Sequence, residues 1–165
     1  TEIKRFDWIR GDVVGGRSLL WARQSYRLSD LDFEANTRDG HGVDWPIRYK
    51  DLAPWYDYVE NFIGVSGQAE GIAHLPDSRF QPPMEMNCVE KDFRARVKQN
   101  YPDRFVTIGR TANLTQPVKG RGQCQNRDLC NRGCPYGAYF SNNASTLPEA
   151  FATGNIKFPG KQSYL

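Results

Sequence analysis

Three of the four cysteines of this 165-residue chain fall within eleven residues, and this group constrains the fold more than any other feature. Cys124, Cys130 and Cys134 have the spacing C-x5-C-x3-C, and Pro135 follows the last of them. Glycines in the same loop let the backbone turn tightly, so three thiolates can converge on one point. Thiolates gathered in this way are ligands of iron–sulfur clusters and of zinc. Because their number is odd, disulfides within the loop cannot use all three.

The spacing of the cysteines favours one kind of metal site over another. Structural zinc sites use four ligands, commonly in CxxC pairs or with histidines. This chain has no CxxC, and His41 and His74 are distant in sequence. Three cysteines without a fourth suit a three-iron cluster, in which each iron takes one thiolate, and Arg127 and Arg132 favour the thiolate form. Cys88 becomes a fourth ligand only if folding brings it near, and the alternative without metal is a loop of free or randomly paired cysteines.

A glycine pair near the N-terminus is the second candidate site. Residues 14–18 read Val-Gly-Gly-Arg-Ser, and we expect an extended segment up to Val14, a turn, and a closely approached backbone through Trp21. Successive N–H groups at such a turn form a concavity for an anion such as a pyrophosphate. The alternative is an ordinary Gly-Gly turn, which short glycine motifs more often mark.

The composition limits the classes of function. The chain has the length of about one domain, and its 15 glycines and 10 prolines predict many loops. The net charge of +3 comes from 22 basic and 19 acidic residues that are interspersed. So mild and mixed a charge does not indicate a nucleic-acid partner or an anionic membrane surface. No apolar run is long enough to span a membrane.

The pattern of apolar residues and breakers predicts an α+β fold with short helices, few strands and long loops. Helices are expected over residues 50–63, 89–100 and 146–154. A short strand is expected over residues 105–108, and residues 136–140 are expected to be extended. Long structureless loops are uncommon in a compact domain, so they indicate that the chain is part of something larger.

Capping residues support the boundaries of these helices. Gly64 is expected to end the first helix. Asn87 with Glu90 has the spacing of a capping box before the second helix, and Thr146 with Glu149 is expected to cap the third.

Several of these segments, taken in order, resemble the glucose–methanol–choline (GMC) family of flavin-dependent oxidoreductases. Residues 14–21 resemble the family's second flavin contact, a GG-x-S-x-x-(N/W) segment. Residues 44–56 resemble its D-W-P-x-x-Y-x-D-L-x-P-(Y/W)-Y stretch, and Gly-Val-Ser-Gly follows at 64–67. Residues 109–114 match a recurrent strand end. The resemblance covers nearly all of residues 8–156 and points to the bacterial FAD-dependent sugar and polyol dehydrogenase branch.

The resemblance implies a flavin site in the first part of the chain. The residues that it places along FAD are Gly15, Gly16, Arg17, Ser18 and Trp21. Some members of the family attach FAD covalently through a histidine just before the tryptophan. Leu20 holds that place here, so the resemblance implies non-covalent FAD.

The same branch implies an iron–sulfur site. Its members carry three cysteines at this spacing, which hold a [3Fe-4S] cluster that passes electrons from flavin to an outside acceptor. Carried over, Cys124, Cys130 and Cys134 become the cluster ligands. Two alternatives are a stand-alone metal-binding or electron-transfer module, with Cys88 as a fourth ligand, and an inactive remnant.

By resemblance, the parent protein oxidises a CH–OH group of a sugar or polyol and hands electrons to an acceptor subunit or cytochrome, often in the periplasm. The family's GxGxxG unit and its C-terminal catalytic histidine are not found in this sequence, so we expect a middle fragment. No residue is predicted to be catalytic, and the chain alone is expected neither to bind FAD tightly nor to turn over substrate.

We interpret the whole chain as one incomplete domain in four parts. Residues 1–35 form the flavin-contacting segment, and residues 36–115 form a helical, substrate-side segment. Residues 116–156 carry the cysteine loop and a short helix. Residues 157–165 fit the family poorly, which is compatible with a truncated or proteolytic piece or a broken gene.

Overall fold

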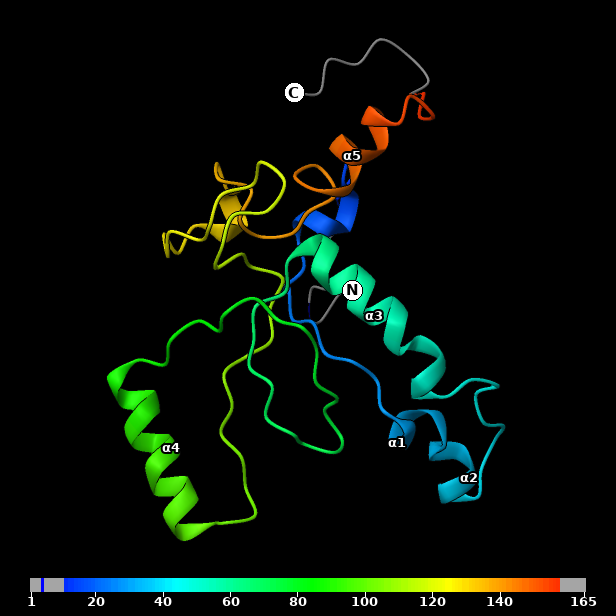
Figure 1. Cartoon of the computed structure of the whole chain (residues 1–165), viewed down its shortest axis with the longest axis vertical. Helices are drawn as coiled ribbons and strands as arrows, with labels where there is room; N and C mark the ends of the chain where they lie inside the picture. Colours follow the sequence, from blue (N-terminus) through cyan, green and yellow to red (C-terminus); the bar gives the residue numbers. More distant parts are fainter. Residues whose placement is uncertain (1–3, 5–10, 158–165) are drawn as a thin grey trace.

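The computed structural model of the chain describes residue 4 and residues 11–157, and regular structure in this part is sparse (Figure 1). The elements in chain order are η1 (Gly16–Leu19), α1 (Asp30–Phe33), α2 (Ala35–Asp39), α3 (Tyr49–Ile63), α4 (Cys88–Asn100), η2 (Cys130–Arg132) and α5 (Thr146–Ala152). The two η elements are single 3-10 turns. Positions 5–10 of the expected N-terminal extended segment and the tail from residue 158 lie outside the described residues.

The two longer predicted helices are confirmed, because their signals are local. α3 begins one residue before the expected start and ends at Gly64, which has a φ of 79°. α4 opens on the expected capping box: the Asn87 side chain accepts from the backbone N–H of Glu90 at 3.0 Å, and the Glu90 carboxylate accepts from Asn87 N–H at 2.8 Å. The expected cap of α5 is wrong, since Ser145 precedes the helix and Thr146 is its first residue.

The β part of the predicted α+β fold is wrong for the part of the chain that the structure describes. That part contains only isolated bridges, among them Gln24 with Thr111, Ser66 with Thr111 and Asn113 with Tyr139. Residues 105–108 form no strand because no neighbouring segment pairs with them along a ladder. Residues 136–140 contain a turn and a single bridge rather than a continuous extended run.

The small core lies where these bridged segments meet, beside the C-terminal end of α3. Its most buried apolar side chains are Val65, Ala112, Leu114 and Ala138, each at most 2% exposed. Phe33 is also buried, but it packs against Trp45 near the N-terminal end of α3. Figure 1 shows α4 standing apart from α3 on the opposite side of this meeting point. The core therefore joins loop segments to one end of α3 and leaves both long helices covered on one side at most.

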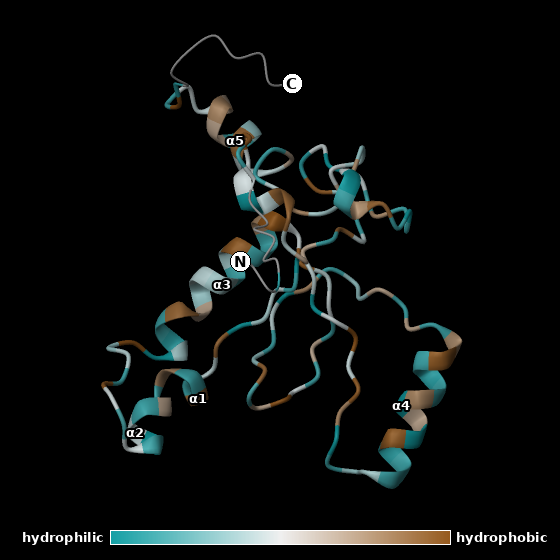
Figure 2. Ribbon diagram, turned by 180° about the vertical axis from the view of Figure 1, so that it is seen from behind, coloured by the Kyte–Doolittle hydropathy of each residue, from teal (hydrophilic) through white to brown (hydrophobic). Residues whose placement is uncertain are grey.

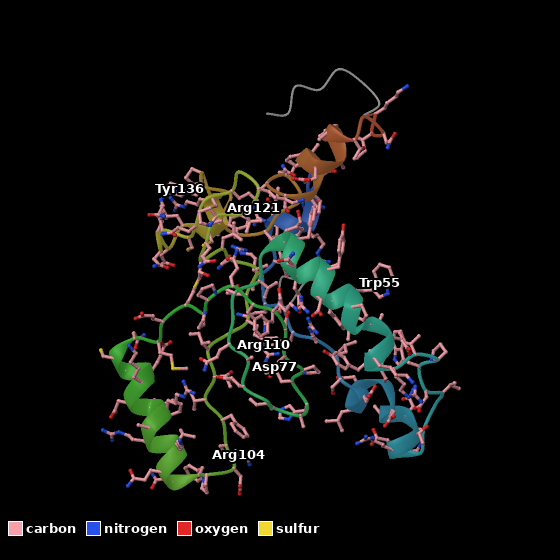
Figure 3. All side chains as sticks on the ribbon, in the orientation of Figure 1. Trp55, Asp77, Arg104, Arg110, Arg121 and Tyr136 are labelled. Atoms are coloured by element: carbon pink, nitrogen blue, oxygen red, sulfur yellow. The ribbon has the colours of Figure 1, made fainter. Side chains whose placement is uncertain are left out.

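Two buried arginines fix loops to this core. The Arg27 guanidinium donates to both carboxylate oxygens of Glu60 in α3, at 3.1 Å from Nε, and to Asp57 at 2.6 Å. Arg110, which is 2% exposed, donates to Asp77 at 2.8 Å and lies over the Phe80 ring at 4.8 Å (Figure 3). These pairs anchor the segment before α1 and the loop between α3 and α4.

The chain exposes more surface than an independent domain of its mass. Its accessible surface is 12642 Å², whereas a compact monomer of 18.9 kDa exposes about 8,300 Å². An excess of about 2,000 Å² remains when the undescribed residues are counted as fully extended. Large apolar side chains contribute to it, including Trp55 on α3, 67% exposed, and Val89 on α4, 72% exposed. Figure 2 shows apolar residues interspersed with polar ones along both helices.

Candidate functional site

The glycine pair, Gly15 and Gly16, forms a left-handed turn that leads into η1. Gly15 has a φ of 96° and Gly16 a φ of 49°, a conformation that side chains with a Cβ rarely adopt. A Cβ on Gly15 would lie 2.2 Å from the Asn143 side-chain oxygen, whereas a Cβ on Gly16 would meet nothing closer than 3.9 Å. Gly15 is therefore favoured by its left-handed backbone, and a side chain there would also displace that of Asn143, whereas Gly16 leaves the backbone open to a neighbour.

Ser18 and Trp21 fasten this turn to the segment that follows the cysteine loop. The Ser18 hydroxyl donates to the carbonyl of Gly15 at 2.6 Å and accepts from the N–H of Asn142 at 3.0 Å. The Trp21 indole N–H donates to the carbonyl of Phe140 at 3.1 Å, and the two rings meet edge to face. Two residues of the 14–21 motif, Ser18 and Trp21, thus make contacts inside the chain.

Arg23 is a residue of this region that sequence reasoning missed. Its φ is 64°, which is uncommon for a residue other than glycine. Its side chain is buried, donates to the carbonyl of Trp21 and lies over the Tyr139 ring at 4.2 Å. Its carbonyl accepts from the N–H of Ala112 at 2.8 Å, a contact between segments far apart in sequence that no periodic pattern marks.

The segment that follows the glycine turn shares one open hollow of about 400 Å³ with the cysteine loop, and Gly15, Gly16, Arg17 and Ser18 do not line it. Trp21 and Arg23 line it from one side, and Asp128 and Cys130 line it from the other. The volume falls within the range of small-molecule and cofactor pockets. The structure therefore brings together two segments that are more than a hundred positions apart in sequence.

The three loop cysteines line a second, smaller hollow of about 20 Å³, together with Tyr136. Cys130 is exposed, whereas Cys124 and Cys134 are half-buried. Backbone N–H groups approach two of the sulfurs: that of Asn126 lies 3.4 Å from the Cys124 sulfur, and that of Ala138 lies 3.3 Å from the Cys134 sulfur. Hydrogen bonds of this kind support sulfur atoms that carry negative charge.

The arrangement brings the predicted cysteine ligands around one hollow but does not form a ready-made metal site. Among the described residues, no group of three or more His, Cys, Asp or Glu side chains is placed to hold a metal ion. Cys88 is exposed at the first residue of α4 and does not line the hollow. Figure 1 shows α4 and the cysteine loop in different parts of the molecule.

Arg121 is a second residue that sequence reasoning missed, and it lies just before the cysteine loop (Figure 3). It is 5% exposed, and its Nε donates to the carbonyl of Gly137 at 2.8 Å. One terminal nitrogen donates to Ile63 at the end of α3, at 2.8 Å, and the other has no hydrogen-bond partner. Burial lowers the pKa of Arg121, and negative charge on Cys134 opposes that shift.

No helix in the described part of the chain has the length and apolar character needed to cross a bilayer.

Comparisons with known proteins place the chain among partial relatives of oxidoreductases. It is 29% identical over 131 residues to the fructose dehydrogenase large subunit of Gluconobacter japonicus, covering 78% of this chain and 24% of the relative. It is 38% identical over 152 residues to 2-methyl-1,2-propanediol dehydrogenase of Mycolicibacterium austroafricanum, covering 86% of this chain and 26% of the relative. It is 29% identical over 130 residues to 6'''-hydroxyparomomycin C oxidase of Streptomyces lividus, covering 76% of this chain and 23% of the relative.

These matches show partial homology between this chain and oxidoreductases of the GMC type. The chain spans about a quarter of the length of the curated relatives that it matches. No family model matches it. The relationship supports the oxidoreductase prediction, and the comparisons give no support to an iron–sulfur cluster.

Proposed function

We propose that this chain is part of an FAD-dependent oxidoreductase that acts on a CH–OH group of a sugar or polyol, with Cys124, Cys130 and Cys134 as ligands of an iron–sulfur cluster. The observation that carries the proposal is the hollow shared by Trp21 and Cys130. In this hollow Trp21, one of the residues expected along FAD, lies beside Cys130 of the cysteine loop, which supports the proposal. An oxidoreductase that sends electrons from flavin to a cluster needs this proximity.

The glycine turn that precedes the larger hollow is compatible with a bound flavin, and Trp21 is the residue expected along FAD that lines the hollow itself. Gly16 leaves its backbone open, and the exposed guanidinium of Arg17 is available to an anionic group. Ser18 and Trp21 hold the turn in place through residues 140–143. Leu20 cannot form a covalent link to the ring, so the flavin would be held without one.

The residues around the smaller hollow are compatible with a cluster only after the loop opens. A space of about 20 Å³ holds about one water molecule, and the seven atoms of a [3Fe-4S] cluster need more. Cys130 and Arg127 are exposed, so their side chains do not have to leave a packed core for the loop to open. The two N–H groups directed at sulfur are then donors to the thiolates of Cys124 and Cys134.

Bound flavin supplies two-electron oxidation of an alcohol carbon, and a bound cluster supplies one-electron transfer to an acceptor. This chain supplies the backbone turn, the thiolates and the packing that holds the two close together. The catalytic base, the electron-acceptor subunit or cytochrome and a periplasmic location belong to the proposed whole protein. The names of the relatives, which include a fructose and a propanediol dehydrogenase, support an alcohol or sugar substrate.

The excess of exposed surface supports a chain that packs against further protein rather than a stand-alone metal-binding module. The distance of Cys88 from the loop also disfavours a module with four cysteine ligands. If the chain is an inactive remnant, we expect the cysteine loop to hold no iron.

Anaerobic reconstitution with iron and sulfide tests the cysteine assignment. Cys130→Ser should lose most of the bound iron, and the matched variant Cys88→Ser should keep it, because Cys88 lies outside the loop. Equal iron retention by the wild type and Cys130→Ser would exclude Cys130 as a ligand. Loss of iron in Cys88→Ser would instead favour the four-cysteine module.

A further inference from the structure

One peptide group connects Arg121 to the sulfur of Cys134. The carbonyl of Gly137 accepts from Arg121 Nε at 2.8 Å. The N–H of Ala138, which belongs to the same peptide unit, lies 3.3 Å from the Cys134 sulfur. The peptide therefore has a cation at its oxygen and a sulfur at its nitrogen.

We propose that Arg121 is a positioning residue that orients and polarises the Gly137–Ala138 peptide so that its N–H donates to the sulfur of Cys134. Nothing in the sequence motifs or in the comparisons assigns a role to this arginine. The effect on a bound cluster rests on the function proposed above, whereas the effect on the peptide does not.

The contacts of Arg121 make it suited to hold this peptide. Besides Gly137, it donates to the carbonyl of Ile63 at 2.8 Å and lies 3.5 Å from the Ser145 hydroxyl. Three elements, namely the end of α3, the turn after the cysteines and the start of α5, are thus tied to one guanidinium. The Gly122 N–H also donates to the carbonyl of Tyr136 at 2.8 Å, which keeps the two backbone segments side by side.

The charge of Arg121 is unbalanced within the described residues. None of the ion pairs recorded there includes Arg121, although its side chain is 5% exposed. One terminal nitrogen is buried without a hydrogen-bond partner. A buried cation of this kind is costly unless a negative group lies nearby. The Cys134 sulfur lies on the far side of the Gly137–Ala138 peptide, where negative charge would favour the charged form of Arg121.

Hydrogen bonds in series strengthen one another in a low-dielectric interior. A cation at the carbonyl oxygen draws electron density from the peptide and makes its N–H a stronger donor. Ala138 is 1% exposed, so water does not compete for that N–H. Removing the arginine should weaken the bond to sulfur even where the peptide stays in place.

The Ala138 amide in the metal-free chain gives a direct test by NMR. In Arg121→Gln, its proton resonance should move upfield, and its exchange with solvent should be about tenfold faster, the factor that corresponds to the loss of one hydrogen bond. Arg132→Gln is the matched control, because it removes the same charge from an exposed position in the same loop. An Ala138 amide that responds equally to both variants would refute the proposal.

A second variant covers the case in which Arg121→Gln does not fold. Cys134→Ala leaves Arg121 and its peptide in place and removes only the acceptor. The Ala138 resonance should shift in Cys134→Ala and stay unchanged in Cys88→Ala. An unchanged resonance in Cys134→Ala would mean that no N–H bond to sulfur exists, and the proposal would be wrong.

The reconstituted chain tests the consequence for a cluster. Arg121→Gln should lower the reduction potential relative to Arg132→Gln by about 59 mV, a tenfold change in a one-electron equilibrium. Failure of the wild type to load iron would count against the proposed function, and the NMR comparison would still decide the role of Arg121. A loaded cluster with equal potentials in the two variants would refute the inference and leave the proposed function standing.

Discussion

Gly64→Ala is the substitution whose cost in stability the structure defines best, because the added Cβ meets both an unfavourable backbone conformation and a steric clash. Gly64 ends α3 in the left-handed region with a φ of 79°. A Cβ there would lie 2.0 Å from the Cδ2 atom of Leu114, whose side chain is fully buried. The Leu114 backbone in turn bonds to the N–H of Cys124 at 2.7 Å and to the carbonyl of Ala138 at 2.8 Å. The strain would therefore reach both sides of the cysteine loop.

The left-handed conformation costs an alanine about 1–2 kcal/mol, and overpacking a filled core costs about 1–3 kcal/mol more. We expect Gly64→Ala to lower the free energy of unfolding by about 2–5 kcal/mol, read from the midpoint of urea denaturation at an unchanged slope. Gly40→Ala is the matched control. Gly40 also ends a helix in the left-handed region, with a φ of 73°, but a Cβ there meets nothing within 4 Å.

The control should show only the conformational cost of about 1–2 kcal/mol. In a Leu114→Ala background the clashing methyl is absent, so the cost of Gly64→Ala in unfolding free energy should fall to the same value. A Gly64→Ala cost no greater than that of Gly40→Ala would refute the predicted contact with Leu114. A cost unchanged in the Leu114→Ala background would show that the strain lies elsewhere.

Three further predictions concern the anchoring pairs and the cofactor. Burial alone would raise the pKa of Asp77, but N–H bonds from Glu70 and Gly71 and the charge of Arg110 lower it overall. The wild type should thus lose stability as the pH falls below the ordinary aspartate value of about 3.9, and an Asp77→Asn variant should lack that part of the acid loss in urea titrations at several pH values. At pH 7, Asp77→Asn should destabilise the chain by about 1–3 kcal/mol, because the buried guanidinium of Arg110 loses its charged partner. A loss below that of an exposed pair such as Arg96 with Asp92 would contradict this. By isothermal titration the isolated chain should show no tight binding of FAD, and tight binding would overturn the view that the flavin site needs further protein.

The helices could be predicted from the sequence because their signals are local. The capping box at Asn87 and the glycine at position 64 act within one turn of the residues that they stop or start. The strands could not be predicted from the sequence, because residues 105–108 have the composition of a strand but pair with no other segment. Pairing depends on the path of the whole chain, which a short apolar run does not encode.

The candidate site was likewise predictable in part. The residue types at the turn and in the cysteine loop were visible as motifs, and in the structure Trp21 and Cys130 line one hollow. Their proximity was not predictable from spacing, because Trp21 bonds to Phe140, 119 positions away. Arg23 and Arg121 were missed because a lone arginine in a loop carries no pattern. Only their burial and their contacts with carbonyl groups show that they hold the site together.

Iron and acid-labile sulfide per chain, counted after anaerobic purification and reconstitution, test the central claim most directly. The account predicts about three irons and four sulfides, the content of one [3Fe-4S] cluster, with a visible absorption band. A colourless chain that retains neither iron nor sulfide after reconstitution would contradict the assignment of Cys124, Cys130 and Cys134 as cluster ligands.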